Sequence, residues 1–249
     1  MASPSAKSFG TGGEPGASRG AHGTAHPMTV AKAVSIPVAG VVLQGDLAIP
    51  ESPVGLALFA HGSRSSRKSP RNQFVARTLR EAGVATLLFD LLTRDEEAAE
   101  AETGALRFNI DLLESRLVAA TGWVATQPET AQLRMGYFGS STGGAAALVA
   151  AATLGRMIGA VVSRGGRPDL AAESLQRVRA PTLLIVGGND DGVLRLNRQA
   201  FAELRCEKEL AVVPGATHLF QEAGTLEEVA HLAAVWFRRH LKPNGQRRE

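Results

Sequence analysis

Ser141 lies at the centre of the pentapeptide Gly-Ser-Ser-Thr-Gly at residues 139–143. An apolar run at 135–138 precedes it and the alanine-rich stretch GAAALVAAA continues it, an order typical of strand, tight turn and helix. A G-x-S-x-G turn in that context strains the backbone at the serine and holds its hydroxyl where a base and a substrate can reach it. Both flanks require glycine because a Cβ there would collide with the neighbouring strand or helix. Ser141 is therefore the predicted nucleophile, and the alternative is a turn that uses small residues only for packing.

A second copy of the pattern, centred on Ser18 at residues 16–20, shows how little the pentapeptide means by itself. It stands among Gly, Ser, Pro and Ala, with no apolar strand before it and no helical pattern after it. We treat that copy as a chance match. The prediction for Ser141 therefore depends on the strand and the helix around it.

A catalytic serine needs a base, and the base needs a group that orients it. His218 follows the predicted strand 208–213 and the loop PGAT, which places it at the carboxyl edge of a sheet. The apolar strand 181–186 ends in GGNDDG, which makes Asp190 the predicted acid and leaves Asp191 as the alternative. The resulting chain order is Ser, Asp, His. Four further histidines fall in the N-terminal segment or in a helical pattern near the end: His22, His26, His231 and His240.

Acyl transfer also needs hydrogen-bond donors for the negative charge that develops on the carbonyl oxygen. The strongly apolar run 54–60 is followed by His-Gly-Ser-Arg, a turn whose backbone N–H groups could face the nucleophile across the sheet. The amides of Ser63 and Thr142 are the predicted pair, since one follows an earlier strand and the other follows the nucleophile. His61 is expected to fix the backbone of this turn, with contact to the substrate as the alternative.

Basic side chains occur near the same predicted edge of the sheet. Arg64 in the turn and Arg164 after the apolar run 159–162 are candidates for substrate binding, because they could attract an anionic substrate. The alternative is that such arginines form surface ion pairs with the acidic stretch 95–102.

The net charge of +3 does not indicate nucleic acid, since aromatic residues are only 5% of the chain and no binding module is recognisable. The sequence contains neither H-E-x-x-H nor a Cys cluster, so no metal is predicted.

The rest of the chain alternates apolar runs with helical patterns. A hairpin is predicted at 31–38 and 41–49, and the βαβ rhythm after it predicts an α/β fold. The sheet should be mostly parallel, with about eight strands and helices on both faces. Between 162 and 181 there is room for only a loop and one short helix, so we expect minimal or no cap over the site. The acidic stretch after Asp90 is the other candidate cover.

Two helix starts have recognisable signals. Ser69 and Pro70 suit the N-cap and the first position of one helix. Thr225 and Glu228 have the spacing of a capping box at the start of the last helix. The apolar face of that last helix is expected to dock on the sheet.

Length and composition fit one catalytic domain, because 249 residues of which 44% are hydrophobic can bury a large core. The predicted domain covers 31–242, between a disordered tail at 1–30 and a frayed end at 243–249. The tail lacks the apolar core of a signal peptide, and no run is long enough to span a membrane. The single cysteine, Cys206, has nothing to pair with, so a cytoplasmic location is expected. Met28 stays open as an alternative start.

Five segments carry a resemblance: LALFAHGSRSSRKSPRNQFVARTLREAGVATLLFDLLT, GYFGSSTGGAAALVAAA, VSRGGRPDL, APTLLIVGGND and VPGATHLF. Together they resemble the dienelactone hydrolase-like branch of the α/β-hydrolase superfamily, in particular the bacterial hydrolase domains found alone or fused to phosphoribosyltransferases. The resemblance covers 31–241 and implies a hydrolase with a triad of Ser141, Asp190 and His218 and no cofactor. Dienelactone hydrolases proper use cysteine as the nucleophile, so the resemblance does not extend to dienelactone as the substrate.

The sequence therefore predicts a serine hydrolase that cleaves small soluble carboxylic esters through an acyl-enzyme. Within enzymes the alternative is a thioesterase or an acyltransferase. The alternative that is not an enzyme is a non-catalytic binding or regulatory protein of the same fold. The predicted partner is a small-molecule ester, with no nucleic acid and no membrane, and a homodimer is compatible with the chain.

Overall fold

The computed structural model describes residues 30–242. The predicted tail, except for its last residue, and the predicted chain end at 243–249 lie outside the described residues. The strands are β1 (Lys32–Val38), β2 (Val41–Ala48), β3 (Gly55–Ala60), β4 (Val84–Phe89), β5 (Met135–Ser140), β6 (Ile158–Arg164), β7 (Thr182–Gly187) and β8 (Lys208–Val213). The α-helices are α1 (Pro70–Glu81), α2 (Arg94–Thr103), α3 (Ile110–Thr126), α4 (Thr142–Leu154), α5 (Asp191–Glu203) and α6 (Thr225–His240). Three 3₁₀ segments complete the set: η1 (Leu106–Phe108), η2 (Gly155–Met157) and η3 (Pro168–Arg177).

The strands form one sheet in the order β1-β2-β4-β3-β5-β6-β7-β8. β1 and β2 are the predicted hairpin, β2 pairs antiparallel with β4, and every later pair is parallel. Strands β3 to β7 are buried along their whole length, which explains why they read as continuous apolar runs in the sequence. The mostly parallel sheet predicted from the βαβ rhythm is confirmed.

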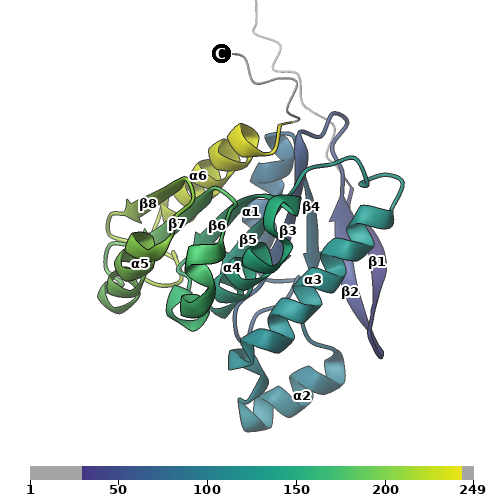
Figure 1. The fold of residues 1–249 in the computed structure, drawn as a ribbon, viewed down its shortest axis with the longest axis horizontal. Coiled ribbons are helices and arrows are strands. Elements are labelled where there is room, and N and C mark those ends of the chain that lie inside the picture. Colours follow the sequence, from purple (N-terminus) through teal and green to yellow (C-terminus); the bar gives the residue numbers. More distant parts are fainter. Residues whose placement is uncertain (1–29, 243–249) are drawn as a thin grey trace, which may run out of the picture.

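Helices cover both faces of the sheet (Figure 1), and each face has its own apolar core. α3, α4, α5 and η3 pack on one face, where α4 contacts both α3 and η3. α1 and α6 pack against each other on the opposite face. α6 buries Val229, Ala233, Trp236 and Phe237 there, so the predicted docking of the last helix is confirmed. In a sheet of this kind the carboxyl ends of the parallel strands meet at one edge, where sites form.

The helix starts differ in detail from the sequence prediction. α1 does begin at Pro70 after Ser69, but the Ser69 side chain makes no capping hydrogen bond. The predicted capping box at Thr225 is wrong, because Gly224 is the N-cap of α6 and the Thr225 hydroxyl donates backwards to the Glu222 carbonyl. A complete capping box instead begins α2 at Thr93.

Candidate active site

Ser141 occupies the turn between β5 and α4, with φ 51° and ψ −121°. A positive φ of this kind is costly for any residue except glycine, so the surrounding structure must hold it in place. The glycines on either side make that possible: a Cβ on Gly139 would lie 2.5 Å from the Gly143 carbonyl oxygen. A Cβ on Gly143 would overlap the carbonyl oxygen of Ala60 and lie 2.5 Å from that of His61. The close approach predicted from the pentapeptide is therefore present.

His218 and Asp190 are brought together by two neighbouring loops. Nδ1 of His218 lies 2.7 Å from Oδ2 of Asp190. The loops after β7 and β8 are joined by the amide of Asn189, which donates to the Ala216 carbonyl at 2.9 Å, and by its side-chain amide, which donates to the Gly215 carbonyl at 3.1 Å. These bonds fix Asp190 beside His218.

Asp191, the alternative acid, is the first residue of α5 and is exposed. Its carboxylate makes no hydrogen bond or ion pair to any residue that the structure describes. The contact with His218 therefore belongs to Asp190, whose side chain is 15% exposed against 40% for His218.

The ring of His218 lies beside the segment that holds Ser141. The backbone amide of Ser141 donates to the Arg164 carbonyl at 3.2 Å, and Gly165 follows directly. A Cβ on Gly165 would lie 3.5 Å from two atoms of the His218 ring, so the ring packs against this glycine. The Ser141 hydroxyl makes no hydrogen bond within residues 30–242. Catalytic hydrogen bonds often form fully only when substrate is bound.

Ser63 and Thr142 face each other next to Ser141, the predicted nucleophile. Their hydroxyl oxygens are 3.2 Å apart, and a Cβ on Gly62 would lie 3.0 Å from Cβ of Ser141. Thr142 is the first residue of α4, where backbone amides lack helical acceptors. Neither the Ser63 nor the Thr142 amide has an acceptor within the described part of the chain. Two free donors beside the nucleophile are what an oxyanion requires.

His61 is buried, and both of its ring nitrogens form hydrogen bonds with backbone groups. Nε2 accepts from the Leu91 amide at 3.0 Å, so Nδ1 carries the proton and donates to the Gly62 carbonyl at 3.0 Å. Burial lowers the pKa of His61, which keeps the ring neutral in this arrangement. The side chain therefore ties the β3–α1 loop to the end of β4, as expected from its place beside a glycine turn.

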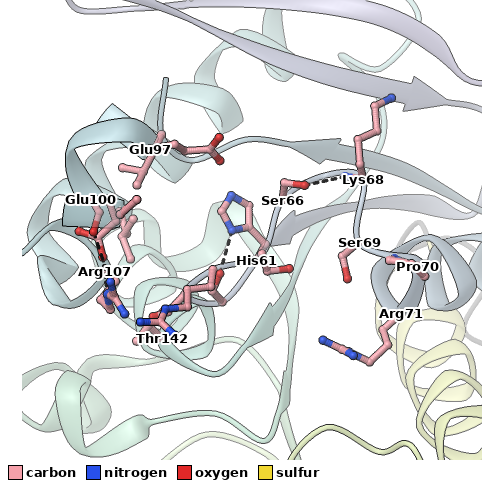
Figure 2. Close-up of a pocket in the computed structure, with 17 residues that line it drawn as sticks. His61, Ser66, Lys68, Ser69, Pro70, Arg71, Glu97, Glu100, Arg107 and Thr142 are labelled. Carbon is pink, nitrogen blue, oxygen red and sulfur yellow. Dashed lines mark hydrogen bonds and ion pairs between the residues drawn. The ribbon is translucent and has the colours of Figure 1, made fainter. Parts of the chain in front are cut away.

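A cavity of about 800 Å³ adjoins Thr142 and the β3–α1 loop (Figure 2). Its far wall comes from the chain between β4 and α3, through Glu97, Glu100 and Ala101 of α2 and Arg107 of η1. Arg107 donates to Glu100, which joins the two segments. Partial burial, together with nearby Asp90, raises the pKa of Glu97. The acidic stretch is thus one wall of the cavity, a placement that the sequence left open.

The arginines near the site divide into paired and unpaired side chains. Arg67 is paired with Asp90 and Asp46, and Arg167 is paired with Asp169. Arg64, an exposed residue with φ 55°, lines the cavity and has no ion pair among residues 30–242. The acidic stretch at 95–102 pairs instead with Arg107 and Arg116, so the alternative of surface pairing with the loop arginines is not found among residues 30–242.

Arg164 is buried, contrary to the expectation of a residue at the mouth of the pocket. It is 8% exposed and its guanidinium carbon lies 6.0 Å from the Phe220 ring centre. Burial, with the nearby Arg71, lowers the pKa of Arg164 to about 10, so it remains charged at neutral pH. The sequence offered no signal for this burial, because a basic residue at the end of an apolar run is ordinarily exposed.

Residues 30–242 hold neither a cluster of candidate metal ligands nor a candidate membrane-spanning helix. No group of three or more His, Cys, Asp or Glu side chains in this part of the chain could hold a metal ion. No helix in the same residues is long and apolar enough to cross a membrane.

The fold and the strained turn at Ser141 define an α/β-hydrolase, and comparison with known proteins identifies the branch. The model of the dienelactone hydrolase family matches residues 67–241, so this chain belongs to the dienelactone hydrolase family. The crystal structure of a dienelactone hydrolase from Anabaena variabilis superposes with a TM-score of 0.85 and 54% identity, covering 87% of this chain and 100% of that one. Membership and this likeness identify the chain as a hydrolase of ester bonds.

Other relatives are similar over different extents. Two proteins from strains of Mycobacterium tuberculosis, provisionally named phosphoribosyl transferases, are each 60% identical over 205 residues. That match covers 82% of this chain but 45% of theirs, so the chain spans less than half the length of these relatives. Est1E from Butyrivibrio proteoclasticus has a TM-score of 0.71 at 18% identity, covering 83% of this chain and 98% of that one, and shares the fold.

Proposed function

We propose that this chain hydrolyses small soluble carboxylic esters through an acyl-enzyme on Ser141. The observation that carries the proposal is the 2.7 Å contact between His218 and Asp190, placed beside a serine with φ 51°. A strained serine, an imidazole and a carboxylate that orients the imidazole are the three parts of a Ser-His-Asp triad. They come from the turns after β5, β7 and β8.

In the proposed first step, Nε2 of His218 takes the Ser141 proton while the serine oxygen attacks the ester carbonyl carbon. Asp190 accepts from Nδ1, which fixes the tautomer and stabilises the imidazolium. The amides of Ser63 and Thr142 donate to the tetrahedral oxyanion. His218 then protonates the leaving alkoxide, and the alcohol departs.

In the proposed second step, His218 takes a proton from water, and the resulting hydroxide attacks the acyl-enzyme carbonyl. The same two amides hold the second oxyanion. Its collapse breaks the bond to the Ser141 oxygen, which regains a proton from His218, and the acid is released. No step needs a cofactor or a metal ion.

A fluorophosphonate probe and three variants test the assignment. The probe should label the wild type on Ser141 and leave Ser141→Ala unlabelled. Ser141→Ala and His218→Ala should each lose roughly four to six powers of ten in kcat with folding retained, because triad members act as a unit. Ser18→Ala changes the other copy of the pattern and is the matched control, with full activity expected. Turnover that survives in Ser141→Ala would overturn the assignment.

The alternatives separate in the same experiments. Hydrolysis of acyl thioesters in preference to oxygen esters of the same acyl group would identify a thioesterase, and transfer to an added alcohol would identify an acyltransferase. Folded protein that the probe does not label would favour a binding or regulatory role. We place the reaction in the cytoplasm, because a single cysteine suits a reducing compartment.

A further inference from the structure

Arg164 is a buried cation without an anionic partner. Its guanidinium makes no hydrogen bond and no ion pair to any residue between 30 and 242, and Nη1 is fully enclosed. The nearby contact is the face of the Phe220 ring, which compensates only in part for lost hydration. Burying an unpaired charge is expensive, so proteins normally supply an opposite charge. The structure provides the cation here and leaves the anion to come from outside.

Besides burial, the charged group that lowers the pKa of Arg164 is a second arginine, Arg71. Arg71 lies close enough to lower the pKa of Arg164 by repulsion, after the larger effect of burial. Arg71 also lacks a hydrogen bond or ion pair in the described part of the chain, and its Nε is buried without a partner. Two unpaired guanidinium groups that repel each other would be stabilised by an anion bound between them.

The beginning of α1 adds to the same positive charge. Arg71 is in the first turn of α1, where the helix dipole already favours an anion and a basic residue is unfavourable. The first turn holds no acidic residue, and Ser69 makes no side-chain cap. Backbone amides of this turn are therefore available to a ligand.

This positive cluster adjoins the candidate active site. The Arg164 carbonyl accepts from the Ser141 amide, and Phe220 lies two residues after His218. Val162, two residues before Arg164 on β6, packs in the core beside α1 and α6, so Arg164 points to the face where α1 begins. Arg71, Ser69 and Ser63 all line the 800 Å³ cavity. Figure 2 shows the Arg71 side chain extending from α1 toward the side where Thr142 lies.

We propose that Arg71, Arg164 and the first turn of α1 bind a phosphate group of the substrate, which makes the preferred substrate a phosphate-bearing ester. This inference rests on the proposed function, because it places the phosphate beside Ser141. A dianionic phosphate neutralises both guanidinium groups, whereas a single carboxylate would leave one positive charge buried. Its three oxygens also match the donors of two arginines and a helix terminus.

Binding can be measured without turnover. Inorganic phosphate, added at constant ionic strength, should raise the melting temperature of the wild type progressively with concentration, as expected for a ligand of the folded state. Arg71→Met and Arg164→Met should each lose this shift. Arg77→Met is the matched control, because Arg77 is on the same helix but is exposed and stacks on Phe74. If Arg164→Met does not fold, Arg71→Met still tests the proposal.

Specificity is measured with three 4-nitrophenyl esters of similar length: the butyrate, the hemisuccinate and the 3-phosphonopropionate. In the wild type we expect kcat/KM to be roughly tenfold or more higher for the phosphonate ester than for the butyrate, with the hemisuccinate between them. Arg71→Met should reduce that ratio to about one, and Arg77→Met should keep it.

The outcomes distinguish this inference from the proposed function. Equal kcat/KM for the butyrate and phosphonate esters, without stabilisation by phosphate, overturns the phosphate site and leaves the esterase proposal intact. Phosphate stabilisation that depends on Arg71, in a protein that cleaves none of the esters, retains the site and contradicts the proposed function. A hemisuccinate preferred over the phosphonate, with a shift produced by succinate and not by phosphate, would assign the site to carboxylates and refute the proposal.

Discussion

His218 and Asp190 are 28 positions apart in the chain, and Nδ1 of one lies 2.7 Å from Oδ2 of the other. This contact depends on two loops that bond to each other: the Gly188 amide donates to the Val213 carbonyl at 2.8 Å. A Cβ on Gly187 would overlap the Ala216 carbonyl oxygen, so the loops approach as closely as backbone allows. Loop packing, in addition to residue type, therefore selects which of the two adjacent aspartates contacts His218.

The first prediction compares those two aspartates. Asp190→Asn should lower kcat by about 10⁴, because an amide would favour the wrong tautomer of His218. Asp191→Asn is the matched control, since it makes the same change one residue away at an exposed position, and should have a far smaller effect. Steady-state kinetics on one short ester measure both variants. The reverse ranking would transfer the role to Asp191.

The second prediction concerns Gly143, the last residue of the Gly-Ser-Ser-Thr-Gly turn. Gly143→Ala should unfold the protein or destabilise it by more than about 3 kcal/mol, because the new Cβ overlaps the backbone oxygen of Ala60. Gly122→Ala, within α3, is the control: no atom lies within 4 Å of its added Cβ. We expect that change to stabilise the helix by about 0.5–1 kcal/mol.

Chemical denaturation of the three proteins tests this pair. The midpoint should fall for Gly143→Ala and rise slightly for Gly122→Ala, at unchanged slope. A stable, active Gly143→Ala variant would mean that the backbone around Ser141 can move apart, and the strained conformation would then need another explanation.

The third prediction uses the acid sensitivity of His61. Burial holds its pKa below the ordinary value of 6.5, so below pH 6.5 the unfolded chain binds a proton that the folded protein does not. Stability should therefore fall as pH is lowered through 6.5, by up to about 1.4 kcal/mol per pH unit, until the pKa of the folded state is reached.

A variant isolates this contribution. His61→Gln keeps an acceptor near the Leu91 amide and removes the titration, so its free energy of unfolding should fall less than that of the wild type over the same pH range. His231→Gln, at an exposed position on α6, should follow the wild type. Equal acid sensitivity in the wild type and His61→Gln would show that His61 is protonated without cost.

The strands and the chain order of the site could be predicted because their signals are local. β8 has the predicted bounds, and β5 and α4 enclose the predicted turn. Strands buried on both faces leave long apolar runs, and a strand that ends in a histidine or an aspartate places that residue at the carboxyl edge.

What could not be predicted depends on residues far apart in sequence. Arg71 acts on Arg164 only because α1 packs on the face of the sheet to which Arg164 points, and no local pattern encodes that. The threonine of the expected capping box lies one position too late, since Gly224 takes the N-cap with φ 80°. The Thr93 capping box has the same spacing, but it lies in a charged stretch without an apolar helical face.

The last prediction concerns the length of the acyl chain. Between β6 and β7 the chain forms only η3 and short connections, so no cap is inserted there. In Figure 1, α2 lies apart from the sheet beside the start of α3, and the groups it adds to the cavity wall include two glutamates, Glu97 and Glu100. The apolar side chains of the lining are too few to form a tunnel: Pro70, Leu92, Ala101 and Leu113.

A long alkyl chain would thus meet charged groups and solvent instead of an apolar tunnel. Each methylene beyond a short acyl group should gain little of the roughly 0.8 kcal/mol available from complete burial. We expect kcat/KM for neutral 4-nitrophenyl esters to be highest at about two to six acyl carbons and to show no activation at an oil–water interface. A maximum at long acyl chains would contradict this, because it would require α2 and η1 to close over the substrate as an apolar cover.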